Sequence, residues 1–263
     1  MHDDIPETAH ELSVGEGDDR RAIAYRSRAG TGPVLVWLGG YRSDMRGTKA
    51  EHLLAYAEAT GRGFLRLDYS GHGESGGRFE DGTISRWTEE ARRVIEASGA
   101  GSVVLVGSSM GAWVALLLTR AARRGECAFS VDALMLLAPA PDFTETLMMP
   151  KLSAEDRAAI ERDGFFAQPS EYSDEPNIFT KALFEDGARH LVLTDMIETG
   201  CPVAIVQGME DPDVPHTHAL TLMERLPAAN VTLTLIRDGD HRLSRPQDLE
   251  TISRVLGGLL SSL

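Results

Sequence analysis

A G-x-S-x-G pattern, Gly107-Ser-Ser-Met-Gly111, carries the residue types needed for nucleophilic chemistry. The apolar run Val103 to Val106 precedes it, and a helical pattern begins at Met110. Small residues on either side of Ser109 allow a turn tight enough to expose the serine hydroxyl. A helix that starts directly after the serine points its free N–H groups at a developing oxyanion. Ser109 is therefore the expected nucleophile of an acyl-transfer reaction, with the backbone N–H of Met110 as one oxyanion donor.

A serine nucleophile needs a base that takes its proton and an acid that orients the base. When the serine follows a strand in this way, the acid and then a histidine are expected after later strands. Asp211 follows the apolar run Pro202 to Val206 and comes before Val214-Pro215, at the turn out of the strand. We expect Asp211 to be the acid, while Glu210 and Asp213 in the same loop remain alternatives.

The expected base is His241, which follows the last long apolar run, Val231 to Ile236, in a loop of Gly and Asp residues. The carboxyl ends of parallel strands meet at one edge of a sheet, so side chains distant in sequence can converge there. A second oxyanion donor is expected in the loop Gly39-Gly40-Tyr41, where glycines permit close backbone approach. The backbone N–H of Tyr41 is the predicted donor.

Three other histidines lie near these loops. His216 and His218 form an H-x-H pair, but no third ligand is evident, and their position at a helix start explains them better. His72 lies in a polar turn after a strand, which we expect to brace the crevice. We expect no metal and no organic cofactor, because a serine, a histidine and an aspartate suffice for the reaction.

The elements that position these residues follow from the hydrophobic pattern. Short β-branched or Leu-rich runs alternate with segments of helical period, which is typical of a mostly parallel sheet with helices on both faces. The predicted central strands, each buried on both faces, are Val34–Leu38, Phe64–Leu67, Ser102–Val106, Ala133–Leu137, Pro202–Val206 and Val231–Ile236. The predicted helices are Thr48–Thr60, Ser85–Ala97, Met110–Arg124, Thr217–Leu226 and Asp248–Leu260. Leu12–Gly17 and Arg21–Arg26 are expected to add an antiparallel edge hairpin, which completes an eight-stranded sheet.

One connection is too long for a simple loop. Residues 142–200 contain no pattern of a buried strand and are rich in Phe, Leu and Met. An insertion of this length is usually functional, so we expect a small helical cap after the sixth strand. The core would then consist of residues 1–141 and 201–263. Apolar residues of the cap either pack against the core or line a substrate pocket, for which the candidates are Met148, Met149, Phe165 and Phe179.

The overall charge narrows the classes of partner. The chain has 263 residues, with 40 acidic and 26 basic side chains and a net charge of -14. This charge disfavours nucleic acids and anionic bilayers, and no apolar stretch approaches the roughly 18 to 20 residues that span a membrane. Polyanionic acyl-CoA is disfavoured as a substrate unless Arg42, Arg46, Arg242 and Arg245 reverse the field near the crevice. The acidic N-terminal residues lack the features of signal and transit peptides, which predicts a cytoplasmic protein.

The motifs together resemble those of α/β-hydrolases. Within that superfamily the chain is similar to the palmitoyl-protein thioesterase and acyl-glucuronide esterase family typified by α/β-hydrolase domain-containing protein ten. The matching segments are Gly40-Tyr41, Gly47–Ala50, Arg66–Gly71 with Gly73 and Ser75, Gly107–Trp113, Gly208-Met209 with Asp211, Val214-Pro215, and Asp240–Arg242. The resemblance covers nearly the whole chain.

This resemblance implies a serine hydrolase of fatty-acyl esters and thioesters, with an S-acylated protein among the possible substrates. It also implies Ser109 as nucleophile, Asp211 as acid and His241 as base. Two other functions remain open from the residues: hydrolysis of C–C or amide bonds by the same three residues, and ligand binding by a vestigial site. An intact set of Ser, Asp and His argues against the second, because a binding module has no need of a base beside an exposed serine.

Overall fold

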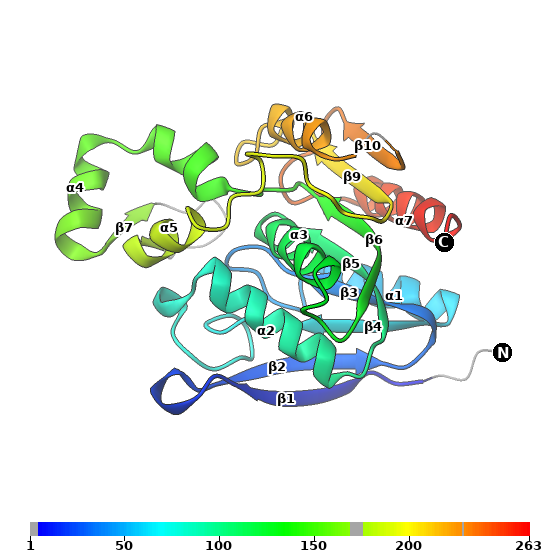
Figure 1. The fold of residues 1–263 in the computed structure, drawn as a ribbon. Coiled ribbons are helices and arrows are strands. Elements are labelled where there is room, and N and C mark those ends of the chain that lie inside the picture. The colour runs from blue at the N-terminus through cyan, green and yellow to red at the C-terminus, as the bar shows by residue number, and fades with distance from the viewer. Residues whose placement is uncertain (1–4, 169–175, 228) are drawn as a thin grey trace.

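A computed structural model describes residues 5–168, 176–227 and 229–263. Its centre is an eight-stranded sheet with the strand order β1-β2-β4-β3-β5-β6-β9-β10, which confirms the predicted α/β architecture (Figure 1). The strands of this sheet are β1 (Thr8–Val14), β2 (Arg21–Arg28), β3 (Thr31–Leu38), β4 (Arg62–Leu67), β5 (Ser102–Ser108), β6 (Ser130–Leu137), β9 (Val203–Gly208) and β10 (Val231–Ile236).

The pairing of the strands places the loops that carry the candidate residues at one edge. β1 and β2 form the expected antiparallel hairpin, although β1 begins at Thr8 rather than Leu12. From β4 to β10 the pairs are parallel, with Leu38 opposite Gly107 and Ser108 opposite Leu137. Because the carboxyl ends of these strands lie side by side, the turns that follow them open onto the same crevice.

Helices cover both faces of the sheet, as the hydrophobic pattern predicts. On one face α1 (Thr48–Thr60) and α7 (Pro246–Leu260) bury residues such as Leu53 and Ile252 against the strands. On the other face lie α2 (Ile84–Ala97), α3 (Met110–Arg123) and α6 (His216–Arg225) (Figure 1). Short 3-10 turns occupy Gly17–Asp19 and Phe79–Asp81. None of the helices in the described residues is both long and apolar enough to cross a bilayer.

β10 departs from the prediction that each central strand is buried on both faces. Thr232 and Leu235 are exposed, and none of its residues is fully buried. The reason is its position, since within the described residues β10 pairs only with β9 and forms the edge of the sheet. An apolar run alone does not distinguish an edge strand from a central one.

The segment between β6 and β9, residues 142–200, places α4, β7 and α5 to one side of the sheet in Figure 1, and the stretch after α5 runs back across the core toward β9. Its described part contains the expected helices and one hairpin that the sequence pattern does not predict, β7 with β8. Its elements are a π-helical turn (Thr144–Met148), a 3-10 turn (Met149–Lys151), α4 (Ala154–Asp163), β7 (Phe165–Gln168), β8 (Asn177–Thr180) and α5 (Lys181–Gly187). The strands of the hairpin have four residues each, too few to establish an alternating pattern.

Candidate active site

Ser109 occupies a strained turn between β5 and α3. Its φ of 53° lies in the left-handed region, and its N–H donates to the carbonyl of Leu137 at 2.9 Å. Steric crowding explains why both flanking residues are glycines. A Cβ on Gly107 would come within 2.4 Å of the carbonyl oxygen of Gly111. A Cβ on Gly111 would come within 2.1 Å of the carbonyl oxygen of Leu38. The backbone therefore accepts no larger residue at either position, and the serine side chain faces the crevice.

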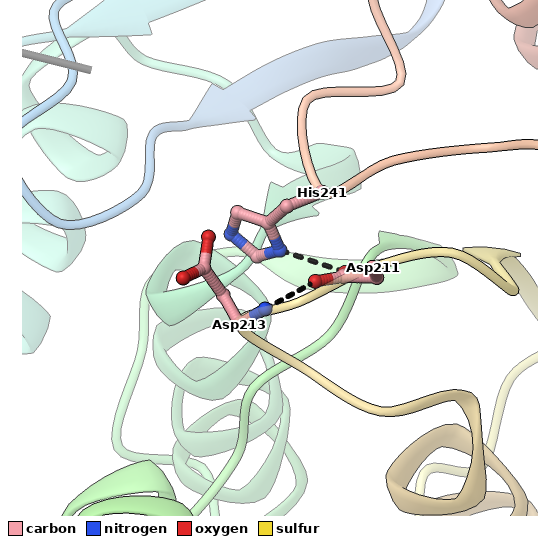
Figure 2. Close-up of side chains that lie close together, drawn as sticks. All are labelled: Asp211, Asp213 and His241. Carbon is pink, nitrogen blue, oxygen red and sulfur yellow. Dashed lines mark hydrogen bonds and ion pairs between the residues drawn. The ribbon is translucent and has the colours of Figure 1, made fainter. Parts of the chain in front are cut away.

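Ser109, His241 and Asp211 form one hydrogen-bonded chain. His241 Nε2 lies 3.2 Å from Ser109 Oγ, and His241 Nδ1 lies 2.8 Å from Asp211 Oδ2. Figure 2 shows the imidazole and the Asp211 carboxylate pointing at each other from the loops after β10 and β9. With Nδ1–H donating to the carboxylate, Nε2 is left as the acceptor for the serine proton. This is the tautomer that a general base toward Ser109 requires.

Asp211 is distinguished from its neighbours by burial and by backbone donors. Its side chain is fully buried, and its Oδ1 accepts the N–H groups of Asp213 and Val214 at 2.9 and 2.8 Å. Gln207, a residue that the sequence analysis did not single out, donates its Nε2–H to Oδ2 at 3.1 Å. Glu210 is exposed, and Asp213 supplies the backbone donor. Of the three acids in this loop, Asp211 thus carries the hydrogen bond to His241.

The same residues also satisfy a geometric test for a metal site. Asp211, Asp213 and His241 each offer one ligand atom, and these three atoms lie within 4.8 Å of one another. Hydrogen bonds already account for this grouping, because His241 Nδ1 faces Asp211 Oδ2 and Asp211 Oδ1 is capped by backbone N–H groups. The H-x-H pair forms no such group: His218 Nε2 donates to the carbonyl of Pro141 at 2.9 Å, and burial lowers the pKa of His218.

The two segments that carry the predicted oxyanion donors lie beside Ser109. A Cβ on Gly40 would approach Ser109 Cβ to 3.2 Å, so the loop after β3 passes close to the serine. Met110 is the first residue of α3, where a backbone N–H has no acceptor within the helix. Tyr41 and Met110 both line the cavity that Ser109 faces.

The Tyr41 side chain connects this loop to the insertion. Its hydroxyl donates to the carbonyl of Ile178 in β8, and its ring stacks on Phe179 with centroids 5.0 Å apart. Phe79 approaches the same ring edge-on at 4.8 Å. Burial raises the pKa of the Tyr41 hydroxyl, so the group is neutral and acts as a donor. Sequence reasoning considered only the backbone of this residue.

A cavity of about 760 Å³ opens over Ser109. Its apolar wall includes Phe143, Leu147, Met148, Phe166 and Phe179, all from the insertion. Two predicted pocket residues, Met149 and Phe165, are not in this lining. Phe165 is 42% exposed, because neighbouring residues of a strand point to opposite faces and Phe166 takes the inner one. Met149 packs against the apolar core instead.

The polar wall of the cavity carries cations, although only half of the predicted arginines contribute. Arg46 is paired with Glu74, and Arg245 is paired with Asp238 and Asp248. Arg42 and Arg242 do line the cavity, and Arg42 lies 4.9 Å from the centre of the Phe79 ring.

Lys49 is a cavity residue that the sequence analysis did not single out. Its Nζ donates to the carbonyl of Arg242, the residue after His241. Burial lowers the pKa of the Lys49 amine to about 8. The hydrogen bond ties the start of α1 to the loop that carries His241.

Known proteins match this chain over nearly its whole length. Residues 34–251 match the model of the Alpha/beta hydrolase family. Palmitoyl-protein thioesterase ABHD10, mitochondrial, from Homo sapiens is 31% identical over 253 residues, which are 96% of this chain and 81% of that protein. A crystal structure from Agrobacterium vitis S4, of a protein assigned only as a hydrolase, has 52% identity and a TM-score of 0.94, with 97% and 99% of the two chains covered. Mouse alpha/beta hydrolase domain-containing protein 10 has 28% identity and a TM-score of 0.84, with 96% and 99% covered.

The comparison corrects the expected compartment. The curated relatives are named as mitochondrial proteins, which contradicts the cytoplasmic prediction. The prediction failed because it rested on the absence of a targeting pattern, and such an absence does not specify a compartment. The fold and the motifs agree with the comparisons: this chain belongs to the alpha/beta hydrolase family and is related to ABHD10 across nearly its whole length.

Proposed function

We propose that the protein is a serine hydrolase that cleaves fatty-acyl esters or thioesters through an acyl-enzyme intermediate. The observation that carries this proposal is the hydrogen-bonded chain from Asp211 through His241 to Ser109, at 2.8 and 3.2 Å. The serine stands at the end of this chain and faces a cavity with an apolar wall. A ligand-binding protein would gain nothing from a buried carboxylate that orients a histidine toward a serine in the cavity.

In the proposed reaction, neutral His241 takes the proton of Ser109 as Oγ attacks the acyl carbonyl carbon. Asp211 holds the tautomer and stabilises the imidazolium that forms. The N–H groups of Tyr41 and Met110 donate hydrogen bonds to the carbonyl oxygen as negative charge develops on it. His241 then gives its proton to the leaving alcohol or thiol, and the acyl group stays on Ser109. Water, activated by His241, hydrolyses the acyl-enzyme and restores the free serine.

Residues 142–200 act in this proposal as a cap over the core formed by residues 1–141 and 201–263. Met148 and Phe179 of the cap would contact the acyl chain, together with Phe166 and Leu147, which share the apolar wall. Burial of methylene groups against such a wall stabilises the bound substrate by about 0.8 kcal/mol for each group. The relatives are named as palmitoyl-protein thioesterases, which supports a long acyl chain and an S-acylated protein or smaller thioester as substrate.

A substrate panel tests the proposed reaction and its substrate class. Purified protein is assayed with p-nitrophenyl esters from acetate to palmitate, the matching N-acetylcysteamine thioesters and a p-nitroanilide. We expect kcat/KM to rise about tenfold for each two methylene groups until the cavity is filled, from the same transfer energy. Activity confined to acetate would contradict the acyl pocket, and a preference for the anilide would favour an amidase.

A further inference from the structure

The loop that carries the proposed oxyanion donor Tyr41 has a second contact that the catalytic chain does not use. The N–H of Arg42, the next residue, donates to His72 Nε2 at 3.2 Å. Arg42 has a φ of 57°, in the left-handed region that a non-glycine residue adopts at some cost. A conformation of this kind persists only where its surroundings hold it, and the His72 acceptor is one such restraint.

His72 is built to accept this hydrogen bond. It is 4% exposed, and its other nitrogen, Nδ1, donates to the carbonyl of Ser70 at 3.1 Å. Both contacts hold together only in the neutral ring with the proton on Nδ1, because a protonated ring has no acceptor. The rings of Tyr69, Phe79 and Trp87 surround the imidazole with centroids 5.0 to 5.8 Å away. This packing fixes the direction in which Nε2 points.

The loop is therefore held at adjacent positions. Tyr41 is anchored by its side chain to β8, and the peptide N–H that follows it is anchored by His72. Phe79 contacts both anchoring groups, since its ring packs against His72 and against the Tyr41 ring, and it also lies beneath the Arg42 guanidinium. A displacement of the peptide between Tyr41 and Arg42 would shift the Tyr41 Cα, which that peptide shares with the preceding one, and would thereby displace the Tyr41 N–H.

We propose that His72 is a positioning residue that holds the oxyanion loop through the N–H of Arg42. It does not touch the substrate, and its effect reaches the reaction through the orientation of the Tyr41 N–H. This inference rests on the proposed serine hydrolase reaction. Because an oxyanion contact strengthens in the transition state, loss of the His72 contact should lower kcat and leave KM nearly unchanged.

Three substitutions separate the two hydrogen bonds of the ring. His72→Gln can place an acceptor oxygen where Nε2 lies, His72→Asn reaches only toward the Ser70 carbonyl, and His72→Leu has neither bond. We expect kcat of the Asn and Leu variants to fall about 10- to 100-fold. This loss does not exceed the one caused by removing an oxyanion donor altogether. The Gln variant should keep a kcat close to that of the wild type. His52→Leu serves as a matched control, since His52 is a half-buried histidine bonded to Ser253 away from the crevice.

The decisive readout is the inhibition constant of an alkyl trifluoromethyl ketone, which forms a tetrahedral adduct on the serine. This constant should rise in the Asn and Leu variants by the same factor by which kcat/KM falls, as expected for a transition-state analogue. Unchanged kcat and unchanged inhibition in both variants would overturn the proposal and leave His72 a packing residue. If His72→Leu fails to fold, the Asn and Gln pair carries the test. A wild-type protein without turnover would instead refute the proposed function.

Discussion

At the scale of single residues, hydrogen bonding rather than sequence position distinguishes the acid of the site. Glu210, Asp211 and Asp213 share one loop; spacing favours Asp211 but leaves the other two as alternatives. Only Asp211 combines a buried carboxylate with two backbone donors on one oxygen and His241 on the other. Such contacts depend on the turn that follows β9, which a linear pattern does not describe.

The rival acids give a direct comparison. Asp211→Asn should lower kcat by roughly 10³- to 10⁴-fold, because an amide in this place no longer holds the Nδ1–H tautomer of His241. Asp213→Asn should lower kcat by less than about tenfold, since its backbone N–H still caps Asp211. Steady-state kinetics with one activated ester measures both variants. A larger fall in kcat for Asp213→Asn than for Asp211→Asn would mean that Asp213, and not Asp211, is the acid of the site.

His72 predicts how stability depends on pH. Burial lowers its pKa from 6.5 to about 4, so between these values the unfolded chain binds a proton that the folded chain does not. The free energy of unfolding therefore falls as pH falls from 6.5 toward 4, by at most about 1.4 kcal/mol per pH unit from this group. Urea unfolding of the wild type and of His72→Gln at pH 7.0, 5.5 and 4.5 measures the difference. An equal pH dependence in both proteins would contradict the buried neutral histidine.

At the scale of elements, the sheet could be predicted but the insertion only in part. Runs of β-branched residues and helical periods located the strands and the main helices within a few residues, because these patterns reflect burial directly. The hairpin of β7 and β8 was missed, since its strands are short and are stabilised by contacts with distant residues such as Tyr41. The pocket face of the insertion was predicted only in part: Met148 and Phe179 line the cavity, but Phe165 was chosen in place of Phe166, because the two are equivalent in sequence and point to opposite faces of β7.

The link between the insertion and the core has a measurable strength. Tyr41→Phe keeps the ring that stacks on Phe179 and removes the hydroxyl that donates to Ile178. The free energy of unfolding should fall by about 1 kcal/mol, the usual value of one hydrogen bond. Limited proteolysis within residues 142–200 should become faster, because this segment loses an attachment. Tyr25→Phe in β2 removes a hydroxyl far from the insertion, and equal proteolysis of the two variants would contradict the link.

At the scale of the whole molecule, the net charge of -14 acts on charged substrates at long range. The cations Arg42, Lys49 and Arg242 line the cavity, together with Lys151 and with Asp44, Asp156 and Asp213. With salt raised from about 10 to 100 mM, the Debye length falls from about 30 to 10 Å, which screens the long-range field first. We expect kcat/KM for octanoyl-CoA to rise severalfold, while that for the neutral octanoyl N-acetylcysteamine thioester stays nearly constant. A fall in kcat/KM for octanoyl-CoA would mean that attraction by the cavity cations outweighs repulsion by the net negative charge.

The central claim is that Ser109 is the nucleophile. Its most direct test is covalent labelling by a fluorophosphonate, followed by peptide mass spectrometry. The wild type and Ser102→Ala, a change at the other end of β5, should each take up one label, and the label should map to Ser109. Ser109→Ala should take up none while it unfolds at the same temperature as the wild type within about 3 °C. Labelling that persists in a folded Ser109→Ala protein would contradict the account.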